Sequence, residues 1–151
     1  MAEIDRAPGG AVTRRRFLAA ATGLATGATL YGGASHAATG PLLMRPIPRT
    51  GERLPVVGLG TAIVFDIGAD AARRAERRRV IAALVDNGAR VIDTAPSYGT
   101  AESVVGDLVA ELGVRERVFL ATKVRAAPRD AAVAEMQASL RRLRSGRLDL
   151  M

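Results

Sequence analysis

Short apolar runs alternate with longer segments of helical periodicity from residue 56 to the end of the sequence. The apolar runs lie at 56–60, 90–94 and 118–122, and the periodic segments lie at 70–88, 100–113 and 128–143. Apolar runs this short predict buried strands, whereas apolar residues spaced three and four apart predict amphipathic helices. Strand followed by helix, repeated three times with short connections, is typical of parallel βα units.

Each predicted helix has one apolar stripe and its own start or stop signal. Gly88 and Gly113 are expected to end the first two helices, Thr100 to cap the second, and Pro128 to open the third. The stripes consist of Val80, Ile81, Leu84 and Val85, then Val104, Val105, Leu108, Val109 and Leu112, then Val133, Met136, Leu140 and Leu143.

Shorter strands are predicted at both ends of this region. The stretch MRPIPRTGERLP, which begins at Met44, predicts a hairpin in which Gly51 takes the positive φ of a tight turn. Residues 148–151 predict the beginning of a fourth strand.

Two α/β architectures are built from βα units. A doubly wound nucleotide-binding sheet carries G-x-G-x-x-G after its first strand, but Gly58 and Gly60 are followed by Ile63 at the third glycine position. A (β/α)8 TIM barrel has about 250 residues, and the sequence supplies roughly three of its eight units. We therefore expect an α/β barrel, represented by about its first three βα units and an N-terminal hairpin. A partial barrel leaves an unpaired strand edge, so we expect the chain not to close into an enzyme by itself.

The first 37 residues are typical of an export signal rather than of a folded domain. Arg14 and Arg15 precede Phe17 and Leu18, which resembles the twin-arginine pattern. A weakly apolar stretch rich in alanine, glycine and threonine continues to about residue 31, too short to span a membrane stably.

Small residues at 35 and 37 then form an A-x-A-like cleavage site. We predict cleavage before Ala38, so that 1–37 is a twin-arginine signal peptide and 38–151 is the N-terminal portion of the barrel domain. The twin-arginine export machinery would bind residues 13–18. The mature protein would be periplasmic or otherwise extracytoplasmic, with no stable membrane span after processing. The alternative is an uncleaved amphipathic or anchoring helix.

Composition and charge exclude several function classes. The 151 residues include no cysteine, which excludes disulfides, cysteine-ligated zinc and a cysteine nucleophile. The net charge of +7 suggests nucleic-acid binding. However, acids lie between the arginines of the predicted helices, and aromatic residues make up only 3%, too few to stack on single strands. We expect solvated helix faces, no nucleic-acid partner and no metal site.

Two charged side chains follow neighbouring strands at the same edge of the predicted sheet. Asp93 ends the second strand and Lys123 ends the third, and functional groups gather at the carboxyl ends of such strands. Because side chains alternate faces along a strand, Asp93 shares a face with Val91 and Lys123 with Ala121. If both rows face the barrel interior, the acid and the amine stand about 5 Å apart. Tyr98 follows Asp93 closely enough to reach the same point.

These three residue types suit proton donation to a carbonyl oxygen. A phenol has a pKa near 10 and donates poorly at neutral pH unless a neighbouring ammonium stabilises its anion. The carboxylate keeps the lysine charged and oriented, so that Tyr98 becomes a general acid as hydride reaches carbon. Taken singly, Asp93 is equally explained as a turn residue, Lys123 as a solvated charge and Tyr98 as a packing aromatic. Together, at matching strand ends, they favour catalysis.

Three motifs, PVVGLGTA, VIDTAPSYGTAESVVG and VFLATKV, resemble the aldo/keto reductase family in their order and spacing. The resemblance covers residues 44–151 and implies a βα barrel that reduces small aldehydes and ketones with NADPH, less often with NADH. It implies that Tyr98 is the proton donor, that Lys123 lowers the pKa of this phenol, and that Asp93 holds the lysine.

The resemblance also implies where the cofactor lies. Gly60 and Thr61, at the end of the first strand, would approach its nicotinamide together with Asp93. Ala62 and Ile63 stand where the family often has bulkier residues that line the substrate site, so the substrate is left open.

The family has a further catalytic histidine a few positions after the strand at 148–151, where this sequence stops, and the only histidine here is His36. We therefore expect an N-terminal fragment that is inactive alone. The alternative function is a non-catalytic, barrel-derived module that binds a nucleotide or a protein.

Overall fold

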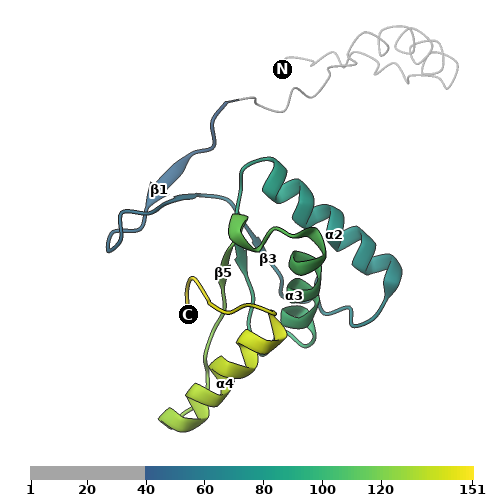
Figure 1. The fold of residues 1–151 in the computed structure, drawn as a ribbon, viewed down its shortest axis with the longest axis vertical. Helices are drawn as coiled ribbons and strands as arrows, with labels where there is room; N and C mark the ends of the chain where they lie inside the picture. The colour runs from purple at the N-terminus through teal and green to yellow at the C-terminus, as the bar shows by residue number, and fades with distance from the viewer. Residues whose placement is uncertain (1–39) are drawn as a thin grey trace, which may run out of the picture. The chain divides into compact units, whose positions relative to one another are not determined.

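A three-stranded parallel sheet with helices packed on one face forms the centre of the structure (Figure 1). The computed structural model describes residues 40–151. The predicted signal peptide and its cleavage site therefore lie outside the described residues. Residues 41–151 form one compact unit.

The helices and strands follow the predicted order. The strands are β1 (Met44–Pro46), β2 (Arg53–Pro55), β3 (Gly58–Gly60), β4 (Val91–Asp93) and β5 (Phe119–Ala121). The helices are α2 (Ala71–Asp86), α3 (Ala101–Leu112) and α4 (Arg129–Arg142), with a short 3-10 helix at Arg115–Arg117 before β5. The first predicted strand is shorter than expected because the Val56 amide donates to the carbonyl of Leu43 in the hairpin.

The three central strands lie side by side in chain order, and both pairs are parallel. Gly60 lies opposite Asp93, and Asp93 lies opposite Ala121. Beyond β5, Leu150 forms an isolated parallel bridge with Ala121. The predicted parallel α/β arrangement is confirmed, whereas the predicted fourth strand amounts to one bridge within the described residues.

The core lies between this sheet and helices α2 and α3. Ile92 and Leu120, at the middle of β4 and β5, have no exposed surface and face the helices. Burying a side chain of this size contributes about 1.5–3 kcal/mol, so these two residues anchor the strands firmly. The helical residues of the same cluster are Ile81, Val85, Ala101, Val104, Val105, Leu108 and Val109.

Two of the predicted helix stripes are only partly buried. Val80 is 39% exposed, Val133 41% and Met136 39%, so part of each of these two apolar stripes lies at the surface. In α4 the cause is the place of contact, because Gly106 of α3 meets the last turn of α4, at Arg142. The first turns of α4 remain exposed.

The start of α3 is capped differently from the prediction. Thr100 precedes the helix, but its side chain makes no capping hydrogen bond. The Thr100 amide and hydroxyl both donate to Oδ1 of Asp66, at 2.9 and 2.8 Å. The Gly68 amide in turn donates to the Thr100 hydroxyl at 2.9 Å. The loop between β3 and α2 thus holds the first turn of α3.

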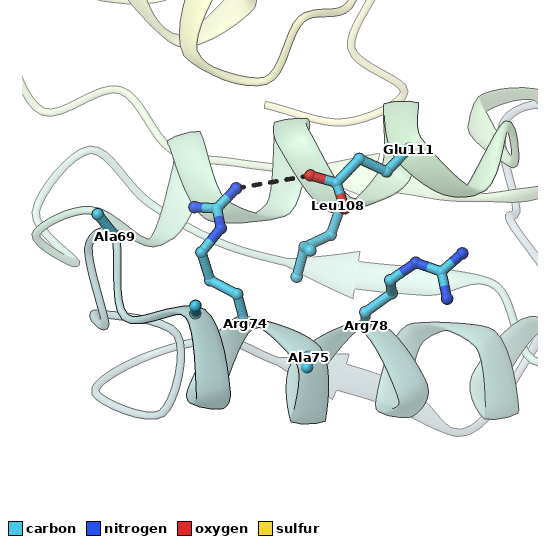
Figure 2. Close-up of a pocket in the computed structure, with 7 residues that line it drawn as sticks. Ala69, Arg74, Ala75, Arg78, Leu108 and Glu111 are labelled. Carbon is cyan, nitrogen blue, oxygen red and sulfur yellow. Dashed lines mark ion pairs between the residues drawn. The ribbon is translucent and has the colours of Figure 1, made fainter.

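An outer groove of about 390 Å³ runs between α2 and α3 (Figure 2). Arg74 spans this groove and forms ion pairs with Asp107 at 2.8 Å and Glu111 at 3.9 Å. The groove is lined by Ala69, Ala71, Arg74, Ala75, Arg78, Leu108 and Glu111. These ion pairs join the two helices outside the core, so we interpret the groove as a helix–helix seam.

The hairpin of β1 and β2 lies against the amino ends of the central strands. Gly51 has a φ of 74°, as the tight turn requires. Arg90, just before β4, forms an ion pair with Glu52 of the hairpin. Phe119, at the start of β5, lines an apolar cleft together with Leu54. The hairpin therefore covers the amino ends and leaves the carboxyl ends of the strands open.

Candidate functional site

The carboxyl ends of β4 and β5 bring an acid and an amine together. Asp93 is the last residue of β4, and Lys123 lies two residues beyond the end of β5. The Lys123 ammonium donates to both Asp93 carboxylate oxygens at 2.8 Å and to the carbonyl of Thr94 at 3.0 Å. Three acceptors match the three hydrogens of an ammonium, so the direction of this side chain is fixed.

This ion pair faces away from the helices. The Asp93 and Lys123 side chains are 47% and 43% exposed, whereas Ile92, the neighbour of Asp93, is fully buried on the helical face. Because side chains alternate along a strand, the charged row lies on the uncovered face of the sheet. A reactant approaching that face would meet both groups.

Tyr98 reaches the same point from the loop between β4 and α3. The Lys123 ammonium lies 5.2 Å from the centroid of the Tyr98 ring, within the range of a cation–π contact. Tyr98 packs against the core while remaining partly exposed. It also lines a cleft of about 460 Å³, together with Ala62, Ile63, Asp66, Arg73, Ser97 and Gly99.

The environment keeps Lys123 charged. Partial burial by itself lowers the pKa of Lys123, but the hydrogen bond and charge of Asp93, with smaller contributions from Tyr98, outweigh it and raise the pKa above its usual 10.5. The ammonium is therefore protonated throughout the neutral range, and it loses its proton only at a more alkaline pH than a free lysine.

Lys123 is the only lysine in the sequence, although lysine and arginine together number 22. Arginine would offer a permanent planar charge at this position, whereas lysine offers a compact ammonium. The chain thus uses arginine for every other basic position and keeps a lysine where the ammonium contacts Asp93 and Tyr98.

Gly60 and Thr61, the other predicted site residues, have different surroundings. A Cβ added at Gly60 would meet no atom within 4 Å, so the space over the end of β3 is open. Thr61 is fully buried, and its hydroxyl donates to the carbonyl of Asp93 at 2.9 Å. The Thr61 side chain therefore supports Asp93 from the helical side of the sheet.

Sequence reasoning missed the contact between Asp66 and Gly99, which holds the loop that carries Tyr98. Gly99 has a φ of 57°, and a Cβ there would lie 2.3 Å from the carboxylate of Asp66. The hydrogen bonds from Thr100 lower the pKa of Asp66 below its usual 3.8, so this carboxylate is an acceptor at neutral pH. The signal in the sequence was a glycine directly after Tyr98, which allows another loop to approach closely.

Residues 40–151 carry neither a candidate metal centre nor a candidate membrane span. No cluster of three or more histidine, cysteine or acidic side chains suited to a metal ion occurs in this range. None of the helices described here combines the length and the apolar character that crossing a membrane requires.

The fold and the site define an α/β protein with an acid, an amine and a phenol at the open ends of parallel strands. The chain matches the Aldo/keto reductase family over residues 56–151. It belongs to this family, as the resemblance implied.

Relatives of known sequence support this assignment. Methylglyoxal reductase YeaE of Escherichia coli is 42% identical over 101 residues, which cover 64% of this chain and 34% of that protein. Aldo-keto reductase YhdN of Bacillus subtilis is 34% identical over 116 residues, or 69% of this chain and 35% of that protein. The chain therefore spans about a third of the length of these curated relatives.

Solved structures of similar fold are also aldo-keto reductases. One from Klebsiella pneumoniae in complex with NADPH has a TM-score of 0.58 and 37% identity, over 66% of this chain and 34% of that one. Another from Klebsiella pneumoniae, in complex with NADP and acetate, has a TM-score of 0.54 and 36% identity, over 66% of this chain and 35% of that one.

Proposed function

We propose that this chain carries the N-terminal part of the active site of an aldo/keto reductase that reduces small aldehydes or ketones to alcohols. The observation that carries the proposal is the contact of the single lysine with Asp93, beside the ring of Tyr98. Membership of the family supplies the reaction class.

Each of the three residues has one task in the proposed reaction. The Tyr98 hydroxyl donates its proton to the carbonyl oxygen of the substrate, which becomes the alcohol. The Lys123 ammonium stabilises the negative charge that develops on the phenol oxygen as the proton leaves. The Asp93 carboxylate holds the ammonium with two hydrogen bonds and keeps it charged.

NADPH is the proposed cofactor, with NADH as the second possibility, and when bound it supplies the hydride that reaches the carbonyl carbon. A Cβ on Gly60, which lies opposite Asp93 in the register, would meet no atom within 4 Å, so the nicotinamide of a bound cofactor would have room to approach Gly60 beside the ion pair. Gly60 and Asp93 would border this ring. Thr61, on the helical side of the sheet, would hold Asp93 in place by donating a hydrogen bond to its carbonyl. The Klebsiella pneumoniae structures in complex with NADPH and NADP support this choice.

The proposed framework is a (β/α)8 barrel of which this chain supplies about the first three βα units and the hairpin. The support is the strand order, because β3, β4 and β5 run in sequence and Leu150 continues the order next to Ala121. A doubly wound sheet reverses its strand order at the ligand site. Neighbours that follow chain order favour a barrel instead.

The test of the function is consumption of NADPH, followed by its absorbance. The substrates tested would be small aldehydes and dicarbonyls, including methylglyoxal. The assay would use the 151-residue chain and any longer product of its gene. We expect turnover in the form that contains a complete barrel, and NADPH loss that depends on the carbonyl compound. Binding of NADPH without turnover in every form would favour the non-catalytic module and contradict the proposal.

We propose separately that residues 1–37 direct twin-arginine export, on the basis of Arg14 and Arg15 in the sequence. Replacing both by lysine is expected to keep the protein in the cytoplasm, because this route recognises the arginine pair rather than positive charge alone. Cell fractionation and N-terminal sequencing check this, with Ala38 expected as the first residue of the exported wild type. The matched control is Arg6→Lys, which should leave export unchanged. Equal export of the double variant would exclude the proposed route.

A further inference from the structure

Glu102 is the only acidic or basic residue within 40–151 that is fully buried, with 1% of its surface exposed. Taking a charge out of water costs several kcal/mol unless the charge is paired and hydrogen-bonded. An apolar side chain of similar size would fill the same space at lower cost. The proposed reaction assigns Glu102 no task, so its burial needs a separate explanation.

Both carboxylate oxygens of Glu102 have a partner. Oε1 accepts a hydrogen bond from the Thr122 hydroxyl at 2.6 Å, and Oε2 accepts one from Nε of Arg142 at 2.6 Å. Bonds to an ionised acceptor at such distances are among the stronger hydrogen bonds in proteins. Glu102 therefore links the first turn of α3 to the end of β5 and to the last turn of α4.

Thr122 connects Glu102 to the backbone that carries Lys123. Thr122 directly precedes Lys123, and side chains of successive residues in an extended segment point to opposite faces. Thr122 is 4% exposed and turned to the helices, while its amide donates to the carbonyl of Leu150 at 3.1 Å. The backbone from which Lys123 projects is thus held from behind by Glu102 and from the side by Leu150.

The second partner keeps Glu102 in place. A Cβ on Gly106, one turn after Glu102, would lie 2.3 Å from the Arg142 carbonyl oxygen, so α3 and α4 touch backbone to backbone there. This contact brings the Arg142 guanidinium within reach of Glu102, and Arg142 also donates to the hydroxyl of the buried Ser139 at 3.2 Å. The carboxylate is therefore clamped between two elements.

We propose that Glu102 is a positioning residue for Lys123, acting through the hydroxyl of Thr122 to fix the direction in which the lysine leaves β5 toward Asp93 and Tyr98. The proposal deepens the proposed function and rests on it. If Glu102 served only the stability of the fold, replacing it would leave the charge and the contacts of Lys123 unchanged in every variant that still folds.

The test uses variants of the intact protein that remove the link at either end. Thr122→Val keeps the shape of the side chain but removes the hydroxyl, and Thr122→Ser keeps the hydroxyl. Glu102→Gln removes the charge of the acceptor. The matched control is Glu111→Gln on the same helix. The Glu111 side chain is 52% exposed, and its ion pair with Arg74 is long, at 3.9 Å. Thermal melting selects the variants that fold.

The first readout does not depend on activity. Because Lys123 is the only lysine, acetylation by an N-hydroxysuccinimide ester followed by peptide mass mapping reports on this one side chain, apart from the N-terminal amine. Only the uncharged amine reacts, and the Asp93 contact keeps it charged. We expect Thr122→Val and Glu102→Gln to react at least about threefold faster at fixed pH, as a fall of half a pKa unit implies. Thr122→Ser and Glu111→Gln should react at the wild-type rate.

The second readout is the pH dependence of kcat. Asp93 raises the pKa of Lys123, so the charged form that supports Tyr98 persists to high pH in the wild type. A variant with a loosened contact lowers this pKa, and its activity should therefore disappear at a lower pH on the alkaline side. The KM for NADPH should stay near that of the wild type.

The outcomes separate this proposal from the proposed function. Folded Thr122→Val and Glu102→Gln variants that acetylate at the wild-type rate would overturn the positioning role, even in an active reductase. Faster acetylation in a protein whose complete-barrel form reduces no carbonyl compound would support the positioning of Lys123 and reject the proposed reductase function. If Glu102→Gln fails to fold, the comparison of Thr122→Val with Thr122→Ser decides by itself.

Discussion

Replacing Tyr98 by phenylalanine is expected to lower kcat for NADPH-dependent carbonyl reduction by about a thousandfold, within the range that a positioned general acid contributes. The substitution removes only the hydroxyl that gives up the proton. The ring remains and keeps its packing against the core and its place 5.2 Å from the Lys123 ammonium. Initial rates of NADPH oxidation by the form that contains a complete barrel, at saturating substrate, measure the effect.

A neighbouring substitution serves as the control for Tyr98. Ser97→Ala changes the adjacent residue in the same loop and the same cleft, and it should lower kcat by less than about tenfold, because it removes no proton donor. The melting temperature of both variants should match that of the wild type. A Tyr98→Phe variant with near-normal kcat would show that another group protonates the carbonyl oxygen. This result would contradict the assignment of Tyr98 as the proton donor.

Replacing Gly106 by alanine is expected to destabilise the protein by about 2 kcal/mol. Alanine favours a helix by about 1 kcal/mol over glycine, but overpacking costs typically 1–3 kcal/mol and occasionally more. Here the new Cβ would lie 2.3 Å from the Arg142 carbonyl oxygen and 2.7 Å from the Cα of Leu143. Both are backbone atoms that cannot rotate aside, so the unfavourable effect should exceed the gain in helix propensity.

Chemical denaturation measures this change in the free energy of unfolding, and thermal melting should show a fall of about 10 °C for a domain of this size. Gly146→Ala is the matched control, because a Cβ there would meet no atom within 4 Å. It should change stability by less than about 0.5 kcal/mol. A Gly106→Ala variant as stable as the wild type would mean that the last turn of α4 is not held against α3.

The pairing of Asp93 with Lys123 could be foreseen because it depends on local rules. Strand periodicity puts every second side chain on one face, and in-order parallel strands carry neighbouring carboxyl ends to the same edge. Asp93 lies opposite Ala121, and Lys123 follows Ala121 by two residues on the same face. The sequence therefore indicated the edge and the partner, on the condition that both side chains face the barrel interior.

The supports of the site could not be predicted in the same way. Glu102 stands in the first turn of α3, where an acid is expected for its favourable interaction with the helix dipole, and nothing local indicates that Thr122 and Arg142 lie beside it. Asp66 reaches Thr100 across more than thirty residues of sequence. Contacts of this kind depend on how loops and helices pack in three dimensions.

The third helix shows the limit of periodicity itself. Val133 and Met136 have the spacing of a buried stripe, yet both are about 40% exposed. A stripe indicates that a surface is able to pack, but the neighbouring element must lie along it. The last turn of α4 contacts α3, and Gly106 of α3 permits this close approach because it has no side chain.

The contact between Asp66 and Gly99 has a consequence for anyone who seeks to redesign the selectivity of this protein. A loop transplanted between β3 and α2 would have to present a carboxylate at the same point, or else the turn that carries the phenol would shift with it. Engineering by insertion or deletion should therefore treat the two loops as a single module and exchange them together.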